Sequence, residues 1–254
     1  MEKKIFYDTT DNIKLCGLIS EVNSSDRIIV LCHGIRGNKT ERKSFDKLTE
    51  KLIANNYNSF RFDFRAHGES SGNDCEMTIT KELQDIDSTI NFLNNKGYRE
   101  FILLGASFGG SIISLLDYSK YDVKALIVWY GALDYKGTTV DLFSSEAKKI
   151  ADEQGYYETY SNSGRKFNFG KELFEEVYKT LPYKELIKTD KPILFVHGTG
   201  DSMVPYTLSE KVSKLCKNSK LVLIENGEHT FDDSENSLNQ ATEATVNFIK
   251  NLNW

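Results

Sequence analysis

Ser107 stands between small residues in the segment GASFGG, directly after the apolar run FILLG at residues 101–105. That run is short and has no internal polar residue, which predicts a buried strand. The next segment, SIISLLDYSK, has apolar residues at helical spacing, so Ser107 falls where a strand turns directly into a helix. So tight a turn pushes its central residue towards positive φ and favours glycine at Gly105 and Gly109. The pattern predicts a nucleophile elbow.

A serine hydroxyl becomes a nucleophile when a base takes its proton, and an imidazole base needs a carboxylate to fix its tautomer. His229, in ENGEHTF, follows the apolar run KLVLIE, and Asp201, in HGTGDSMVP, follows the run KPILFVHG. Both therefore lie at the carboxyl ends of predicted parallel strands, the edge where such sheets bind ligands. We expect Ser107 to be the nucleophile, His229 the base and Asp201 the acid that orients it.

The oxyanion of a tetrahedral intermediate needs hydrogen-bond donors. We expect these to be the backbone N–H groups of Phe108, at the start of the elbow helix, and of Ile35 in the loop HGIRG. Gly34 and Gly37 let that loop turn and approach a substrate closely. Arg36 leaves two alternatives open, a solvent-exposed side chain or a clamp for a substrate carboxylate. Gly34 and Arg36 are predicted to contact the substrate.

The remaining three histidines are less suited to catalysis. His33 and His197 each end a buried strand just before a glycine, which indicates a structural or loop-shaping role. His67 lies in the polar loop RAHGES, where the residues alone do not assign it a role.

Strands and helices alternate along the chain and would place these residues. After an opening hairpin in residues 4–20, strands are predicted at residues 27–34, 58–64, 101–105, 123–131, 191–198 and 220–225. Helices are predicted at residues 44–55, 78–97, 206–215 and 236–252, besides the one after Ser107. This alternation predicts an α/β fold with a mainly parallel sheet covered by helices on both faces.

Residues 133–181 interrupt the alternation. They contain no strong strand, are polar and helical in patches, and are rich in aromatic rings. A connection of this length inside a compact domain is usually functional. Because it is too short for a core of its own, we expect a lid inserted into a single domain that spans residues 1–254. Its predicted substrate-binding residues are Tyr135, Tyr156, Tyr157 and Tyr160.

The chain resembles the α/β-hydrolase superfamily over essentially its whole length. Within it, the chain looks most like bacterial cinnamoyl and feruloyl esterases and their serine-aminopeptidase-like relatives. The stretches that carry the resemblance are CHGIRGNKTE, FDFRAHGESSG, GASFGGSI, KPILFVHGTGDSMVP and LIENGEHTF. The order serine, aspartate, histidine is also that of the superfamily. The resemblance implies the same triad and oxyanion donors, a lid that shapes the acyl pocket, and a structural His67.

Two positions depart from the pattern of these esterases. Ala106 stands where histidine is frequent, and Arg36 stands where a small or aromatic residue is common. Both positions line the active site in the family. The resemblance therefore supports the assignment of the triad but does not identify the substrate.

Composition excludes several classes of function. The net charge of −5 and the absence of a basic cluster argue against nucleic acid as a partner. No run approaches the length of a membrane span, and the first ten residues do not resemble a signal peptide. Four scattered cysteines predict free thiols and a cytoplasmic location. Neither they nor the histidines have metal-ligand spacing, so no metal or cofactor is expected. Oligomeric state is not fixed, and a homodimer stays open.

The expected function is a serine carboxylesterase acting on a small-molecule ester with a short or aromatic acyl group. Three alternatives remain: a peptidase or amidase, a thioesterase or lysophospholipase, and a catalytically silent binding protein. An aminopeptidase would need an acidic pocket for a free amine. The lid offers carboxylates without a clear arrangement, namely Glu146, Asp152, Glu153 and Glu158.

Overall fold

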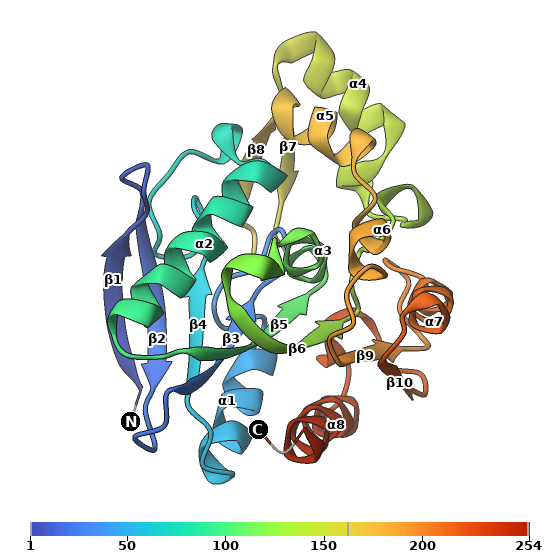
Figure 1. The fold of residues 1–254 in the computed structure, drawn as a ribbon. Helices are drawn as coiled ribbons and strands as arrows, with labels where there is room; N and C mark the ends of the chain where they lie inside the picture. Colours follow the sequence, from blue (N-terminus) through green and yellow to red (C-terminus); the bar gives the residue numbers. More distant parts are fainter. Residues whose placement is uncertain (1, 162, 253) are drawn as a thin grey trace.

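The structure, a computed structural model, describes residues 2–161, 163–252 and 254. Within these residues one eight-stranded sheet has the order β1-β2-β4-β3-β5-β6-β9-β10 (Figure 1). The first two strands are antiparallel to their neighbours and the others run parallel. The strands are β1 (Lys3–Asp8), β2 (Lys14–Ser20), β3 (Arg27–Cys32), β4 (Ser59–Asp63), β5 (Glu100–Ala106), β6 (Asp122–Trp129), β9 (Ile193–Gly198) and β10 (Ser219–Ile224). The predicted α/β-hydrolase fold is confirmed.

Helices cover both faces of this sheet (Figure 1). They are α1 (Ser44–Ala54), α2 (Ile79–Asn95), α3 (Phe108–Leu115), α7 (Tyr206–Leu215) and α8 (Glu235–Asn251). Side chains of a strand point alternately to opposite faces. In β3, Ile28 and Val30 accordingly join the core beneath α2 and α3, while Ile29 and Leu31 join the core beneath α1 and α8. The central strands are mainly apolar because both of their faces are buried, although β4 also buries Arg61 and Asp63.

Local signals set the helix ends close to their predicted positions. The side chain of Thr78 caps α2 by accepting a hydrogen bond from the N–H of Lys81 at 3.1 Å. Gly97, just beyond the end of α2, has φ of 106°, a conformation that glycine adopts without a steric penalty. The predicted stop at this glycine is confirmed.

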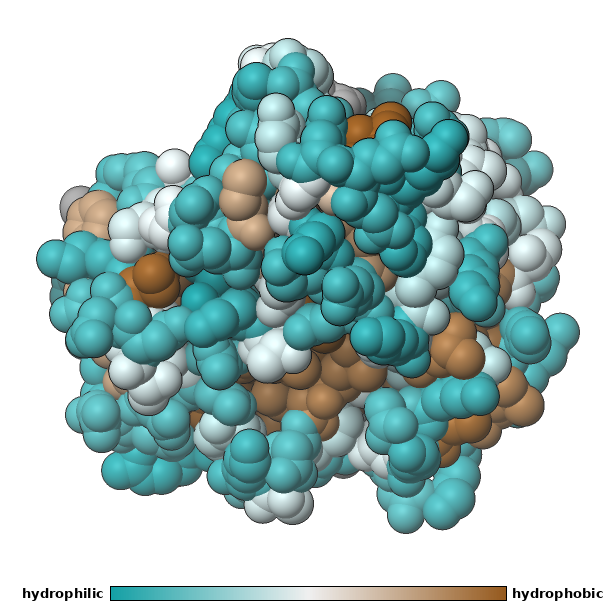
Figure 2. Space-filling model, turned by 90° about the horizontal axis from the view of Figure 1, so that it is seen from above, coloured by the Kyte–Doolittle hydropathy of each residue, from teal (hydrophilic) through white to brown (hydrophobic). Residues whose placement is uncertain are grey.

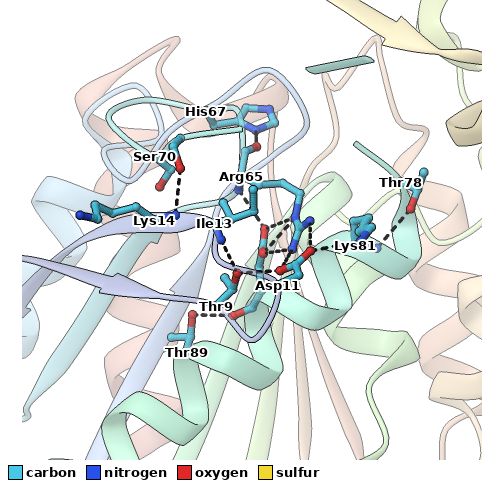
Figure 3. Close-up of polar contacts among 12 residues, drawn as sticks. Thr9, Asp11, Ile13, Lys14, Arg65, His67, Ser70, Thr78, Lys81 and Thr89 are labelled. Carbon is cyan, nitrogen blue, oxygen red and sulfur yellow. Dashed lines mark hydrogen bonds and ion pairs between the residues drawn. The ribbon is translucent and has the colours of Figure 1, made fainter. Parts of the chain in front are cut away.

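An arginine network ties the opening hairpin to the body of the fold (Figure 3). The Arg65 side chain donates to Asp85 on α2 at 2.6 Å and to Asp11, in the β1–β2 turn, at 2.9 Å. Asp11 also accepts a hydrogen bond from Lys81 at 3.1 Å. Because Arg65 is almost fully buried, these bonds fix the loop that follows β4. That loop carries His67.

The segment predicted as a lid, residues 133–181, leaves the sheet after β6 and leads back to it at β9. It contains η3 (Tyr135–Gly137), η4 (Asp141–Phe143), α4 (Ser145–Gln154), β7 (Tyr156–Tyr160), β8 (Lys166–Gly170) and α5 (Lys171–Lys179), and α6 (Pro182–Leu186) follows it directly. β7 and β8 form an antiparallel hairpin, so the expectation that this stretch holds no strong strand was wrong. Only Thr159 of β7 is buried, which explains why no apolar alternation marks that strand.

The lid shares the core of the body. Phe167, Phe169, Leu173 and Phe174 are buried in the same cluster as residues of α2 and α3. Seen from the lid side, the surface is mainly hydrophilic, with apolar residues gathered in a central band (Figure 2).

Candidate active site

Ser107 lies at the turn between β5 and α3, as the sequence predicted. Its φ of 52° and ψ of −117° are strained for a residue with a side chain. The turn is held because its N–H donates to the carbonyl oxygen of Trp129 at 2.9 Å. A methyl group on Gly109 would collide with the carbonyl oxygen of Cys32, and one on Gly105 would collide with the backbone of Gly109. The flanking glycines are therefore required by close backbone contacts.

Ser107, His229 and Asp201 form one chain of hydrogen bonds. The Ser107 hydroxyl donates to His229 Nε2 at 3.1 Å, and His229 Nδ1 donates to Asp201 Oδ2 at 2.7 Å. His229 begins η5 (His229–Phe231), on the loop after β10, and Asp201 lies on the loop after β9. The His229 ring packs against Tyr130, with 4.6 Å between ring centroids. The geometry suits transfer of the serine proton to the imidazole.

The Asp201 carboxylate is fully buried and fully hydrogen-bonded. Oδ1 accepts from the N–H groups of Met203 and Val204 at 2.8 and 2.9 Å. Oδ2 accepts from His229 and also from His197 Nε2, at 3.0 Å. Burial alone would raise the pKa of Asp201, but the hydrogen bonds from His197 and His229 outweigh it and hold the pKa below its usual range. Asp201 therefore stays ionised beside the imidazole.

Two backbone donors lie unused beside the serine. In the part of the chain that the structure describes, the N–H groups of Ile35 and Phe108 have no hydrogen-bond acceptor. Phe108 is the first residue of α3, whose N-terminal N–H groups lack intrahelical partners. His67 has its two ring nitrogens 2.8 and 3.1 Å from the carbonyl oxygens of Arg65 and Ile35. It thereby links the fixed loop after β4 to the loop that would hold an oxyanion.

His33, like His67, is held by contacts between its ring nitrogens and backbone groups. Its Nδ1 donates to the carbonyl oxygen of Gly34 at 2.7 Å, and its Nε2 accepts from the N–H of Phe64 at 3.0 Å. Burial lowers the pKa of His33 well below the ordinary value, so the ring is neutral.

A cavity of about 230 Å³ opens beside Ser107 and His229. Part of its wall is apolar, formed by Ile35, Val140, Phe143 and Met203. The rest is polar and includes residues of the loop after β3, of the His229 loop and of the β7–β8 turn: Gly34, Arg36, Gly37, Asn38, Thr40, Glu41, Arg42, Thr230, Ser161 and Ser163. A site with one apolar and one polar wall suits a ligand whose two halves differ in polarity.

The four tyrosines predicted to bind substrate lie elsewhere and do not line this cavity. Tyr135, in η3 of the lid, is buried against Phe108 and Phe143. Tyr156 and Tyr160 lie on β7 with 37% and 52% of their surface exposed to solvent. Tyr157 is half-buried on the same strand. The β7–β8 hairpin, which the sequence did not reveal, accounts for the positions of Tyr156, Tyr157 and Tyr160. Of the lid's rings, Phe143 is the one that reaches the cavity.

Arg36 fits neither of the two alternatives in full. Its side chain is only 18% exposed, and it lies 3.3 Å from the carboxylate of Asp141 in the lid. It also donates to the Thr159 hydroxyl of β7 at 2.9 Å. Arg36 therefore joins the predicted oxyanion loop to the lid at the cavity's edge.

Comparisons with known families agree with this geometry. A family model described as "Serine aminopeptidase, S33" matches residues 23–154, more than half of the chain. A second model, described as "alpha/beta hydrolase fold", matches residues 136–232. The chain belongs to this family of α/β-hydrolases. In this hydrolase the turn that carries Ser107 lies directly after β5, where the sequence predicted the nucleophile elbow.

Similar proteins match between 60% and 97% of this hydrolase. The uncharacterized protein YfhR of Escherichia coli (strain K12) is 24% identical over 97% of this chain and 80% of its own. Est1E from Butyrivibrio proteoclasticus, solved with ferulic acid bound, is 25% identical, with a TM-score of 0.77 over 97% of this chain and 99% of its own. The human palmitoyl-protein thioesterase ABHD10 is 29% identical, over 60% of this chain and half of its own.

Among the described residues of the hydrolase, no group of three or more histidine, cysteine or carboxylate side chains could hold a metal ion. No helix in that part of the chain is both long enough and apolar enough to span a bilayer. Cytoplasmic location and a homodimer stay predictions.

Sequence reasoning missed two residues of this site. His197 touches the triad acid, and its place just before Gly198 indicated only a loop-shaping role. Glu41 lies in the polar run NKTERK, which is typical of an exposed loop, yet it is buried and lines the cavity. No signal in a single sequence distinguishes it from its exposed neighbours.

Proposed function

We propose that the protein is a serine carboxylesterase that cleaves esters of short-chain or aromatic acids, cinnamoyl and feruloyl types included, through an acyl-enzyme. The observation that carries the proposal is the hydrogen-bond chain from Ser107 through His229 to Asp201, beside two unused backbone donors.

The first half of the reaction acylates the serine. His229 Nε2 takes the proton of Ser107 as the hydroxyl oxygen attacks the ester carbonyl carbon. The N–H groups of Ile35 and Phe108 stabilise the oxyanion that forms. Asp201 holds the His229 Nδ1–H, so that Nε2 is free to accept a proton. The protonated His229 then gives its proton to the leaving alcohol oxygen as the ester C–O bond breaks.

Water completes the cycle. His229 takes a proton from a water molecule that attacks the acyl-enzyme carbonyl, and a second tetrahedral intermediate forms on the same donors. When that intermediate collapses, the proton returns to Ser107 and the free acid leaves. The proton transfers use Ser107 and His229, whose side chains are already hydrogen-bonded, and His229 is held by Asp201.

The size of the cavity supports a small acyl group. About 230 Å³ is less than the ~300–1,000 Å³ typical of pockets for drug-sized ligands. A buried methylene contributes about 0.8 kcal/mol, but only where the pocket is deep enough to bury it. Phe143 can meet an aromatic acyl ring edge-on or stacked, worth about 0.5–1.5 kcal/mol. The likeness to Est1E, a protein solved with ferulic acid, supports the aromatic type.

The test is kcat/KM for p-nitrophenyl esters with acyl chains of two to sixteen carbons, together with methyl ferulate. We expect the value to rise from acetyl to about butyryl and then collapse, while methyl ferulate is hydrolysed. Palmitoyl esters cleaved as fast as butyryl esters, with no hydrolysis of ferulate, would contradict the proposed acyl group. Ser107→Ala is the matched control and should hydrolyse none of them.

Two alternatives have support of their own. The family description names a serine aminopeptidase, and the relative ABHD10 is a thioesterase. Adding aminoacyl p-nitroanilides and acyl thioesters to the same panel separates them. The lid carboxylates that could bind a free amine, Glu146, Asp152, Glu153 and Glu158, do not line the cavity, which favours the ester.

A further inference from the structure

Glu41 places a free acceptor atom beside the nucleophile. Its side chain is 4% exposed, and its Oε2 accepts a hydrogen bond from the N–H of Gly34 at 3.1 Å. Its Oε1 has no hydrogen-bond partner in the described residues, although Glu41 lines the cavity. A methyl group on Gly34 would stand 3.1 Å from that Oε1 and 3.2 Å from Ser107 Cβ. Oε1 and Ser107 Cβ would therefore both contact the same added methyl group, which places Oε1 close to the nucleophile.

The backbone around Glu41 is held in a strained conformation. Glu41, Arg42 and Lys43 have successive φ values of 40°, 51° and 71°, the left-handed region that non-glycine residues avoid. The Ser44 hydroxyl donates to the Glu41 carbonyl oxygen at 2.5 Å. Arg42 is fixed in turn by an ion pair with Asp232 at 2.9 Å. Strain of this kind persists where the surrounding structure holds it, and it is found mainly at binding sites.

The polar wall that contains Glu41 lies on the leaving-group side. In the proposed mechanism His229 protonates the departing alcohol oxygen, so the alcohol must lie against the His229 loop. Arg42 Nη1 contacts the Thr230 hydroxyl of that loop at 3.3 Å, which brings the Glu41 segment to the same side. The apolar wall formed by Val140, Phe143 and Met203 is left for the acyl group.

The free acceptor suits a neutral donor better than a cation. Burial raises the pKa of Glu41 to about 7, with the Gly34 N–H opposing that shift. The carboxyl is thus only partly ionised near neutrality, and the guanidinium of Arg42 is its neighbour in the chain. A hydroxyl can donate to a carboxyl oxygen in either protonation state, whereas the charge of a buried ammonium group is compensated only when the carboxyl is ionised.

We propose that Glu41 accepts a hydrogen bond from a hydroxyl group on the alcohol half of the substrate, so that preferred substrates are esters of hydroxylated alcohols. The inference rests on the proposed esterase function and adds a specificity-determining residue to it. A site built to pair with a substrate hydroxyl discriminates against analogues that lack it, because the buried acceptor is then left unpaired.

The experiment compares kcat/KM for three butyrate esters of similar size. 2-Hydroxyethyl butyrate carries a donor, 2-methoxyethyl butyrate carries only an acceptor, and propyl butyrate carries neither. Wild type should prefer the hydroxyethyl ester over both others by about tenfold. In Glu41→Gln the amide oxygen can keep the Gly34 bond, and the NH₂ group then faces the cavity. Because NH₂ donates equally well to an ether or a hydroxyl oxygen, the preference for hydroxyethyl over methoxyethyl should fall to about unity.

The matched control is Glu50→Gln, an exposed residue on α1, which should keep the wild-type ratio. Equal wild-type rates on all three esters would overturn the inference, even if Glu41→Gln failed to fold. An unchanged ratio in a folded Glu41→Gln with lower rates on every ester would overturn it too and leave Glu41 as support for the oxyanion loop. A preference for 2-(dimethylammonio)ethyl butyrate over the hydroxyethyl ester would show a cation subsite instead. Cleavage of thioesters or amides with no ester hydrolysed would reject the proposed function itself.

Discussion

His197 and His229 donate to the same atom, Oδ2 of Asp201, at 3.0 and 2.7 Å. His197 is buried, and its Nε2 also lies 2.9 Å from the carbonyl oxygen of Val204. Because both partners of Nε2 can only accept, the proton is on Nε2, and Nδ1 accepts from the Ser209 hydroxyl at 2.8 Å. Only His229 reaches Ser107. One imidazole thus anchors the carboxylate while the other is positioned to move protons, and the acid is held from both sides.

This arrangement predicts the effect of Asp201→Asn. An asparagine NH₂ pointing at His229 Nδ1 would favour the tautomer with its proton on Nε2, which cannot take the serine proton. We expect kcat to fall by about four orders of magnitude while the circular dichroism spectrum stays unchanged. Asp190→Asn, which changes an exposed carboxylate outside the chain of hydrogen bonds to Ser107, is the control. Near-normal activity in Asp201→Asn would instead point to Asp232 or Asp233 as the orienting acid.

The contacts of Arg36 predict how the lid is held. Arg36→Ala removes the ion pair with Asp141 and the hydrogen bond to Thr159, so the β7–β8 hairpin should detach more readily. Because the pair is partly exposed, the free energy of unfolding should change by no more than about 1 kcal/mol. We expect trypsin to cut faster after Arg165, in the turn between the two strands, or after Lys166, the first residue of β8.

Its control is Arg27→Ala, which removes an ion pair with Glu100 at the opposite end of β3. Cleavage at the hairpin that is no faster in Arg36→Ala than in this control would show that Arg36 does not hold the lid.

Glycine at position 109 is required by a backbone contact, so Gly109→Ala should destabilise the protein. The added methyl group would collide with the carbonyl oxygens of Cys32 and His33, and these are backbone atoms rather than the ends of flexible side chains. We expect a loss of about 3 kcal/mol in the free energy of unfolding, measured with urea. At Gly137 a methyl group would meet nothing within 4 Å, and alanine there should change stability by less than 1 kcal/mol. Similar values for the two variants would show that the elbow is looser than described.

A buried carboxyl on α2 predicts a pH dependence of stability. Glu82 is 1% exposed, and neither of its oxygens has a hydrogen-bond partner in the described residues. Burial, and then the charge of Asp85, raise its pKa well above the ordinary value of 4.5. The folded state therefore holds this proton more tightly than the unfolded state. The resulting stabilisation is complete below pH 4.5 and is lost as the pH rises towards the folded-state pKa.

Glu82→Gln removes this ionisation. Relative to the variant, wild type should lose up to about 1.4 kcal/mol of unfolding free energy per pH unit above pH 5. Urea unfolding of both proteins from pH 5 to pH 8 measures the difference, with Glu50→Gln as an exposed control. If wild type and Glu82→Gln change in parallel with pH, Glu82 titrates normally.

Periodicity and motif spacing predicted much of this molecule. The central strands are apolar on both faces, so their runs stand out, and Ser107, Asp201 and His229 each follow such a run. The β7–β8 hairpin was not predicted because β7 buries only Thr159 and β8 is only five residues long, so neither strand shows a long apolar alternation. The positions of Tyr156 and Tyr160 were therefore not predicted either. The roles of Arg36 and Glu41 depend on how loops pack against one another in the fold. A local sequence pattern does not reveal such packing.

The most direct test of the central claim is labelling with a fluorophosphonate followed by mass spectrometry of the intact protein and its peptides. Fluorophosphonates react with a serine whose hydroxyl is activated by a neighbouring base. We predict one adduct per chain, located on Ser107, and none in Ser107→Ala. Labelling that persists in Ser107→Ala, or an adduct on another serine of wild type, would contradict the assignment of the nucleophile.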